Sequence, residues 1–397
     1  MQFSPFSISR LPRISYGSGR AAEVPALAAG YGRTALLVTG KQSFCATAGW
    51  QTFTQALEKN GVSWLHFTVS GEPSPMLVDQ AVSRFRNKAI DVVIGIGGGS
   101  VLDAAKAIAG LLPHGNSVMD HLEGVGNNIP YRGPSTPFIA VPTTAGTGSE
   151  ATKNAVLSVQ GPNGFKKSFR DECLIPEYAI IDPDLLTTCP PELVAADGMD
   201  AFTQLLESYV SLKANPFIDA LAWSGMTAVK EGFFAAWQGN EPEAGLGRAA
   251  MAYAALLSGI TLAQVGLGSV HGLASPLGAF FPIPHGVVCG TLVSVATEIN
   301  ITAMQQREPQ NPALAKYAQV GRLLTGRDDL DDTGAHSALI ALLADWSEQL
   351  QLPRLNGYGI SADDFPMIIA NSRGSSMLTN PIVLTDREIR EILQRRI

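Results

Sequence analysis

The first half of the chain alternates short apolar runs with longer segments of helical periodicity. The apolar runs are rich in β-branched residues and carry hydrophobic side chains at consecutive positions, as strands buried on both faces do. They are Arg33–Thr39, Ser63–Val69, Asp91–Ile96, Pro137–Val141 and Tyr178–Ile181. Helical patterns lie between them at about Trp50–Asn60, Pro75–Lys88 and Ser100–Leu112. This alternation predicts a parallel sheet covered by helices on both faces.

The pattern changes after a proline-rich stretch at Asp182–Glu192, beyond which β-branched runs become scarce. Long Ala- and Leu-rich amphipathic segments follow at about Leu193–Leu212, Pro216–Gln238, Gly245–Gln264, Val287–Met304, Asn311–Leu324 and His336–Leu350. Such segments predict an all-helical region. We therefore expect an α/β domain over 1–185 and a helical domain over 186–397. A ligand site is expected in the cleft between them.

Composition and charge narrow the classes of partner. The net charge is −7 and no run of Lys and Arg occurs, so neither nucleic acid nor an anionic membrane surface is an expected partner. The N-terminal segment lacks the basic and apolar regions of a signal peptide, and Ala249–Ile260 is too short and too interrupted to span a bilayer. We expect a cytoplasmic globular protein.

The cysteines are scattered, without a CxxC pair, at Cys45, Cys173, Cys189 and Cys289. This spacing is typical of small buried side chains in a reducing compartment, rather than of disulfides or zinc ligands.

A glycine-rich turn follows the predicted strand that ends at Ile96. Gly97, Gly98 and Gly99 precede Ser100, which opens an Ala-rich helix that also carries Asp103. Glycines let the backbone approach an anion closely, and the start of a helix stabilises negative charge. A pyrophosphate is the expected guest of this turn. The alternative is a tight strand-to-helix turn without a ligand.

A second turn, Val141–Ser149, also follows a predicted strand. Its hydroxyl groups suit contacts with phosphate, ribose or carboxamide, and they belong to Thr143, Thr144, Thr147 and Ser149. Neither turn matches the GxGxxG pattern, so the ordinary dinucleotide fingerprint is absent.

The end of the first predicted strand bears on the choice between NAD(H) and NADP(H). A carboxylate at this place would hold the ribose hydroxyls and repel a 2′-phosphate. The chain instead has Gly40, with Lys41 and Ser43 beside it, which leaves room and a positive charge. This favours NADP(H) over NAD(H). The alternative for Lys41 is a solvated loop lysine.

Four residues of the helical half could hold a divalent metal. Asp200 and Gln204 are four residues apart and share one helix face, while His271 and His285 have glycine neighbours and otherwise apolar surroundings. Histidine and carboxylate around an open position make a Lewis-acid site. The alternative is that both histidines are hydrogen-bonded core residues. We assign that structural role to His66, His114, His121 and His336.

Together these segments resemble the iron-containing (group III) alcohol dehydrogenases over nearly the whole chain. The motifs that carry the resemblance are the 97–106 run, the Pro-Thr-Thr-Ala-Gly-Thr-Gly-Ser-Glu run ending at Glu150, Ile181–Asp184, Gly198–Asp200, Pro284–Gly286 and the tail Asn380-Pro…Leu384-Thr-Asp…Ile392.

The resemblance implies a Rossmann-like nucleotide domain, a helical metal and substrate domain, and a homodimer. It implies a metal, Fe²⁺ or Zn²⁺, that assists hydride transfer between a nicotinamide cofactor and a small alcohol or aldehyde. In such enzymes an aspartate and three histidines hold the metal; the aspartate falls on Asp200 and two histidines on His271 and His285, which we take as the catalytic pair. The lysine near the cofactor falls on Lys166.

Two positions depart from the family pattern. Gln204 stands where a histidine is usual, and its amide oxygen is a weaker donor, so metal affinity should fall and preference could move away from Fe²⁺. Ser275 stands where a second histidine is usual, which removes a proton relay or a cofactor contact. Asp197, one turn before Asp200, could add a carboxylate, but we expect it to cap the helix.

These observations predict an NAD(P)-dependent alcohol dehydrogenase or aldehyde reductase, with phosphates on Gly98–Ser100 and the nicotinamide near Thr143 and Thr144. The proton would come from water on the metal or from a cofactor hydroxyl. Three alternatives stay open: a metal-independent reductase similar to maleylacetate reductases, a cyclase-lyase resembling dehydroquinate synthases, and a nucleotide-binding sensor without turnover.

Overall fold

The strands of the N-terminal half form one parallel sheet. The computed structural model describes residues 5–41 and 43–397. Within them, six parallel strands pair in the order β1-β8-β5-β4-β2-β3. Their bounds are Arg13–Tyr16 (β1), Thr34–Gly40 (β2), Ser63–Val69 (β3), Val92–Gly97 (β4), Phe138–Pro142 (β5) and Tyr178–Ile181 (β8). Each predicted strand lies in this sheet.

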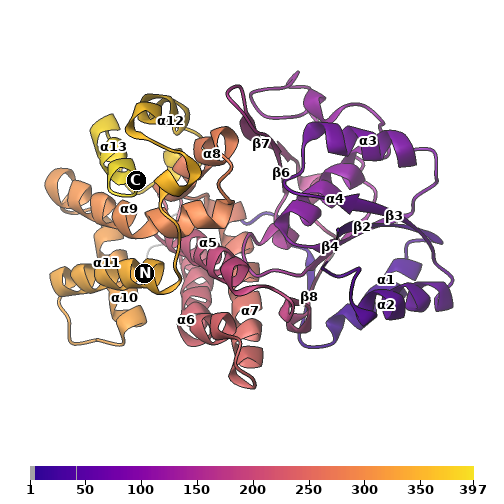
Figure 1. Ribbon diagram of the computed structural model, residues 1–397, viewed down its shortest axis with the longest axis horizontal. Coiled ribbons are helices and arrows are strands. Elements are labelled where there is room, and N and C mark those ends of the chain that lie inside the picture. The colour runs from indigo at the N-terminus through magenta and orange to yellow at the C-terminus, as the bar shows by residue number, and fades with distance from the viewer. Residues whose placement is uncertain (1–4, 42) are drawn as a thin grey trace.

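Helices cover both faces of the sheet (Figure 1). Along β2, Leu36 and Val38 pack with helices α3 (Pro75–Phe85) and α4 (Gly99–Leu111). The alternate residues Ala35 and Leu37 pack on the other side with α1 (Val24–Ala29) and α2 (Ala48–Lys59). Successive side chains of a strand point to opposite faces, so a strand buried on both sides must be apolar throughout. The two-sided α/β arrangement predicted from the apolar runs is confirmed.

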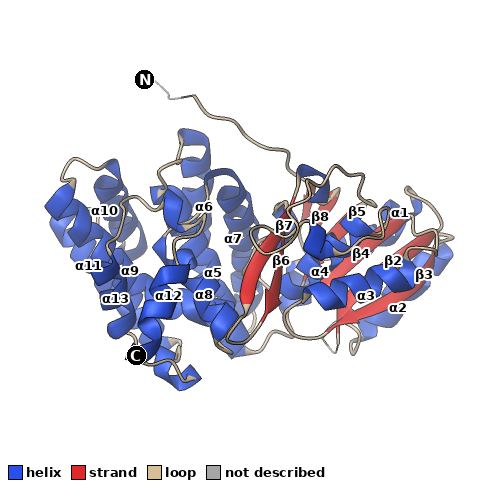
Figure 2. Ribbon diagram, turned by 90° about the horizontal axis from the view of Figure 1, so that it is seen from above, coloured by secondary structure: helices blue, strands red, loops and turns tan. Residues whose placement is uncertain are grey.

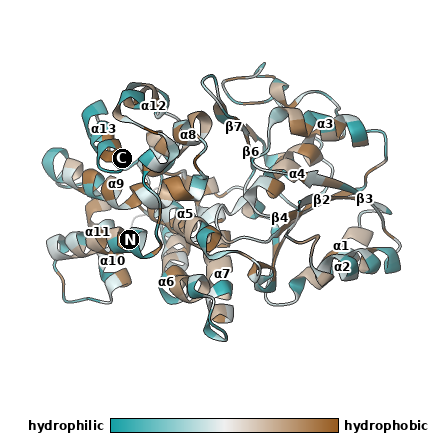
Figure 3. Ribbon diagram, viewed as in Figure 1, coloured by the Kyte–Doolittle hydropathy of each residue, from teal (hydrophilic) through white to brown (hydrophobic). Residues whose placement is uncertain are grey.

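The C-terminal half consists of helices, while the strands gather in the other half (Figure 2). The helices are Pro191–Val210 (α5), Pro216–Gln238 (α6), Glu243–Val265 (α7), Ser269–Phe280 (α8), His285–Arg307 (α9), Pro312–Thr325 (α10), Asp332–Gln349 (α11), Phe365–Asn371 (α12) and Asp386–Gln394 (α13). Figure 3 shows apolar residues concentrated on the sheet and the inner helices. The predicted helical half is confirmed.

Helices α7 and α9 are apolar enough, and long enough, to cross a membrane by composition alone. In this fold, 61% and 89% of their most apolar windows are buried inside the protein. Both therefore serve as core helices of the described structure.

Some elements lie outside the predicted set. β6 (Asn154–Val159) and β7 (Phe165–Arg170) form an antiparallel hairpin apart from the main sheet. β7 mixes basic and aromatic residues, so it has no apolar run to mark it. Helix α8 contains Pro276, which obscures its periodicity. Helices α1, α12 and α13 were not predicted either, because they are too short to show a clear helical period in the sequence.

The two halves meet where helix α7 crosses the second glycine turn. Gly148 has a left-handed backbone, with φ of 62°. A Cβ added to Gly259 of α7 would lie 2.1 Å from the carbonyl oxygen of Gly148. Backbone therefore packs directly on backbone at this junction, and only glycine fits on either side.

We predict that Gly259→Ala lowers the free energy of unfolding by about 1–3 kcal/mol, because the added methyl group meets backbone that has no room to move. Gly245→Ala is the matched control on the same helix, since its methyl would approach only the ends of the Glu241 and Arg248 side chains. Urea unfolding of both variants measures the difference. Equal midpoints for Gly259→Ala and the unchanged protein would contradict the close contact.

Candidate active site and metal centre

A cleft of about 930 Å³ lies between the two halves. Its walls include both glycine turns on one side and residues of α5, α8 and α9 on the other. The cleft thus brings together the predicted cofactor and metal residues, which are far apart in the sequence.

The first turn leaves no space for side chains. β4 ends at Gly97, and α4 begins at Gly99. A Cβ on Gly99 would lie 2.7 Å from the side chain of Thr147, and one on Gly98 would lie 3.1 Å from that of Thr144. The two turns therefore pack against each other, and the first exposes backbone and the start of a 13-residue helix, with Ser100 in its first turn, to the cleft.

A buried lysine fixes the second turn to helix α4. The fully buried Lys106 ammonium donates hydrogen bonds to the carbonyl oxygen of Ser149 at 2.8 Å, to Thr152 Oγ1 at 2.9 Å and to the carbonyl oxygen of Asn154 at 2.6 Å. Ser149 Oγ in turn donates to Asp103 Oδ1 at 2.5 Å. Burial lowers the pKa of Lys106 to about 8, against the opposing effect of Asp103.

Two of the predicted cofactor residues, Asp103 and Ser149, thus belong to this buried network while they also line the cleft. Lys106 was not among the predicted site residues. The signal was a lysine in the middle of an otherwise apolar helix, where a charge must find partners.

The second turn lines the cleft with Thr143, Thr144 and Thr147. Asp197 lies beside Thr144, and burial followed by the charge of Asp200 raises the pKa of Asp197 to about 7. The predicted capping role of Asp197 is wrong, because α5 begins at Pro191 and Asp197 sits within the helix.

The end of β2, where the cofactor ribose was predicted to lie, contributes to the wall of the cleft. Gly40 and Ser43 line the cleft, and Lys41 is exposed. A Cβ on Gly40 would lie 3.4 Å from Ser43 Oγ, which is ordinary contact. A side chain would therefore fit at position 40, where the chain has glycine.

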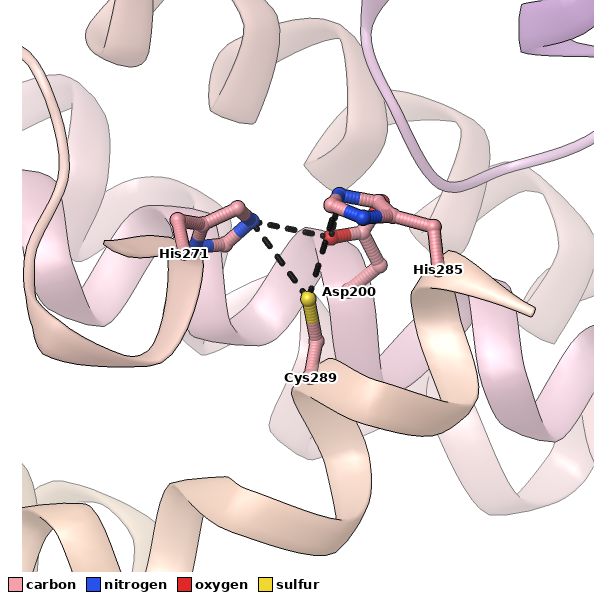
Figure 4. A group of neighbouring side chains, drawn as sticks. All are labelled: Asp200, His271, His285 and Cys289. Carbon is pink, nitrogen blue, oxygen red and sulfur yellow. Dashed lines mark hydrogen bonds and ion pairs between the residues drawn. The ribbon is translucent and has the colours of Figure 1, made fainter. Parts of the chain in front are cut away.

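Four donor atoms from three helices converge at the far side of the cleft (Figure 4). Asp200 comes from α5, His271 from α8, and His285 and Cys289 from the first turns of α9. Asp200 Oδ1 lies 3.1 Å from His271 Nε2 and 3.6 Å from His285 Nε2. All four donor atoms lie within 4.8 Å of one another. Carboxylate, imidazole and thiolate are ligands of divalent transition metals, so the group fits a metal.

Glu207 orients one of these donors, His271. It accepts a hydrogen bond from His271 Nδ1 at 2.7 Å, and others from the backbone N–H groups of Gly268 at 2.9 Å and Val270 at 2.7 Å. With Nδ1 held by the carboxylate, the His271 ring turns Nε2 toward the other donors, as metal-binding histidines commonly do. The same carboxylate satisfies N–H groups at the start of α8.

The electrostatics keep two donors of this group, Asp200 and His285, in the protonation state that binds a metal. Burial alone would raise the pKa of Asp200, but His285 and His271 lower it to about 2, so the carboxylate is ionised. Burial lowers the pKa of His285 to about 4, so its imidazole is neutral at pH 7. Burial raises the pKa of Cys289 to about 12.

The remaining predicted residues lie nearby with other partners. Gln204 Oε1 accepts a hydrogen bond from Ser258 Oγ at 2.7 Å. Ser275 Oγ donates to the carbonyl oxygen of Lys166 at 3.4 Å. Lys166, on β7, pairs with Glu72 at 2.7 Å. All three predicted residues line the cleft.

Cys289 is a free, buried cysteine, as predicted, but its polar neighbours were not predicted. We expected a small buried side chain of no chemical role, and the structure places its Sγ 3.5 Å from His271 Nε2 and 3.9 Å from His285 Nε2. The signal was its spacing, four residues after His285. The predicted helix began at Val287, which left His285 in a loop and hid the shared face.

Comparison with known proteins matches both halves of the chain. Residues 12–183 match the model of the iron-containing alcohol dehydrogenase family, and residues 194–397 match the model of the C-terminal region of Fe-containing alcohol dehydrogenases. Alcohol dehydrogenase 4 of Saccharomyces cerevisiae is 32% identical over 329 residues, which cover 82% of this chain and 81% of that protein.

Further similarity is found with a bacterial enzyme and with a solved structure. The NAD-dependent methanol dehydrogenase of Bacillus methanolicus is 31% identical over 329 residues, which cover 81% of each chain. The crystal structure of a 1,3-propanediol oxidoreductase superposes with a TM-score of 0.88 at 28% identity, over 99% of this chain and 100% of the other.

Proposed function

Since the chain belongs to the iron-containing alcohol dehydrogenase family and is an oxidoreductase acting on CH–OH groups, we propose that it transfers hydride in this cleft, beside a divalent metal held by Asp200, His271 and His285. The substrates are small alcohols and aldehydes. The observation that carries the proposal is the convergence of these three donors on a cleft that both glycine turns also line.

The cofactor would lie on the 1–185 domain. Its pyrophosphate fits the start of α4 at Gly98–Ser100, where free backbone and the helix dipole favour negative charge. The nicotinamide would lie by Thr143 and Thr144, on the side that faces the 186–397 domain. The nicotinamide supplies the acceptor or the donor of the hydride.

The chain's own residues would prepare the substrate site. The ionised Asp200 and the neutral His285 present lone pairs without first losing a proton. Glu207 fixes the His271 ring by its 2.7 Å hydrogen bond, so little reorganisation is needed during turnover. A divalent metal bound there supplies Lewis-acid polarisation of the substrate oxygen.

The alternative function within this fold is that of a metal-independent reductase. Gln204 and Ser275 suggest it, because both stand where the family pattern has a histidine. The family relationship sets aside the cyclase-lyase and the non-enzymatic sensor. A cytoplasmic location stays a prediction from the sequence.

We predict that His271→Ala lowers kcat/KM by roughly 100-fold or more, because it removes a metal ligand together with its Glu207 support. NADPH binding, followed by fluorescence, should be unchanged, since the nucleotide turns lie in the other domain. Turnover is measured as NADPH oxidation on a panel of aldehydes, with and without a chelator. His114→Ala, outside the cleft, is the control. Activity that survives both the substitution and the chelator would contradict the metal-assisted function and show that the protein is a metal-independent reductase.

We propose NADP(H) as the preferred cofactor, on the support of the space beside Gly40. Gly40→Asp should lower the ratio of kcat/KM for NADPH to that for NADH by about tenfold or more, because a carboxylate repels a 2′-phosphate and binds ribose hydroxyls. Gly40→Ala, which adds the Cβ without charge, should leave the ratio unchanged. If Gly40→Asp behaves like Gly40→Ala, the 2′ end of the cofactor lies elsewhere.

We also propose a homodimer that forms through the edge strand β1. β1 lies at one end of the sheet order, and Ile14 and Tyr16 are 43% and 39% exposed there. Free strand edges with apolar side chains pair readily with another chain. Light scattering should give twice the mass of one chain, and Ile14→Arg should give the monomer mass. A monomer before substitution would refute the proposal.

A further inference from the structure

We propose that the thiolate of Cys289 is a metal ligand in place of the Gln204 amide, so that the centre has an Asp–His–His–Cys donor set. The inference rests on the proposed metal-assisted function. It identifies Cys289 as the fourth ligand of a chain that has Gln204 where the family pattern has a histidine.

The spacing of the donor atoms fits a tetrahedral metal. With metal–N and metal–O distances of about 2.0 Å and a metal–S distance of about 2.3 Å, tetrahedral geometry separates N from O by about 3.3 Å and S from N by about 3.5 Å. The N–O separations here are 3.1 and 3.6 Å, and the S–N separations are 3.5 and 3.9 Å. Four of the six separations between donor atoms are thus close to the tetrahedral values, and all six lie within 4.8 Å.

The position of Cys289 on helix α9 explains why its sulfur reaches this centre. His285 is the first residue of α9 and Cys289 lies one turn later, so both side chains share a face. The thiol is fully buried, and its polar neighbours are the two imidazoles and Asp200. An inert core cysteine is normally surrounded by apolar side chains instead.

Gln204 has a different partner. Its amide oxygen, the one atom that could bind a metal, accepts the 2.7 Å hydrogen bond from Ser258. Ser258 belongs to α7, next to Gly259 at the junction of the two halves. The helical packing thus provides Gln204 with a buried neutral partner, whereas Cys289 faces the other three donors.

The changed donor set alters the charge of the centre. Two anionic ligands, Asp200 and the Cys289 thiolate, neutralise a divalent cation, while one carboxylate with three imidazoles leaves a net positive charge. Thiolate is also a softer donor than imidazole or amide oxygen. We therefore expect Zn²⁺ and Co²⁺ to bind in preference to Fe²⁺.

The test replaces the bound metal with Co²⁺ and records the absorption spectrum. Wild-type protein loaded with Co²⁺ should show a thiolate-to-cobalt charge-transfer band in the near ultraviolet. Cys289→Ser should lose the band and bind Co²⁺ about 10–100-fold more weakly. Cys45→Ser, which changes a partly buried cysteine outside the group, should keep both properties. X-ray absorption of the zinc-loaded wild type should show one sulfur at about 2.3 Å.

The X-ray absorption measurement uses the wild-type protein, so it keeps the inference testable if Cys289→Ser folds poorly. A second variant tests the exchange of ligand between the two positions. Adding Gln204→His to Cys289→Ser should restore tight Co²⁺ binding without the charge-transfer band. A wild-type protein that binds one Co²⁺ and turns over, but shows neither the band nor a sulfur neighbour, would overturn the role of Cys289 and leave the proposed function standing. A wild-type protein that binds no metal and ignores the chelator would overturn both.

Discussion

The buried ammonium group of Lys106 determines how the two cofactor turns lie relative to each other. A charge removed from water is tolerated only when hydrogen bonds replace its hydration, and the carbonyl and hydroxyl groups of Ser149, Thr152 and Asn154 provide them. Ser149 belongs to the second turn, Asn154 begins β6 and Thr152 lies between them, while Lys106 belongs to the helix that follows the first turn. The position of the second turn thus follows from that of α4, and the side chains of Thr144 and Thr147 then fill the space that the glycines of the first turn leave.

From this frame the site extends across the junction of the two halves. The backbone of Gly148 packs directly against that of Gly259 in α7. This contact brings Ser258 and Gln204 close to the second turn. On the helical side, Glu207 ties the beginning of α8 to α5, so Asp200 and His271 face each other before any ligand arrives. Most polar groups at this depth are hydrogen-bonded to one another, although the buried Nδ1 of His285 has no hydrogen-bond partner among the described residues.

The sequence predicted the sheet and the long helices, because these depend on local pattern, and most of the predicted site residues line the cleft. Strands such as Val92–Gly97 are apolar on both faces, and only a buried parallel sheet satisfies that pattern. The β6–β7 hairpin escaped because its residues face mixed surroundings. Cys289 and Lys106 escaped for a different reason: their roles depend on which residues other helices and turns bring beside them. An error of two residues in the start of α9 was sufficient to separate His285 from Cys289.

The double task of Glu207 has an evolutionary consequence. Its carboxylate both completes the start of α8 and aims the His271 ring, so a substitution there would damage folding and chemistry together, and selection has little freedom at that position. Positions 204 and 289 carry no such double task. In the proposed donor set, position 204 lacks a donor while position 289, on a separate helix, supplies one, so the metal preference of the centre can change while its place in the cleft stays the same.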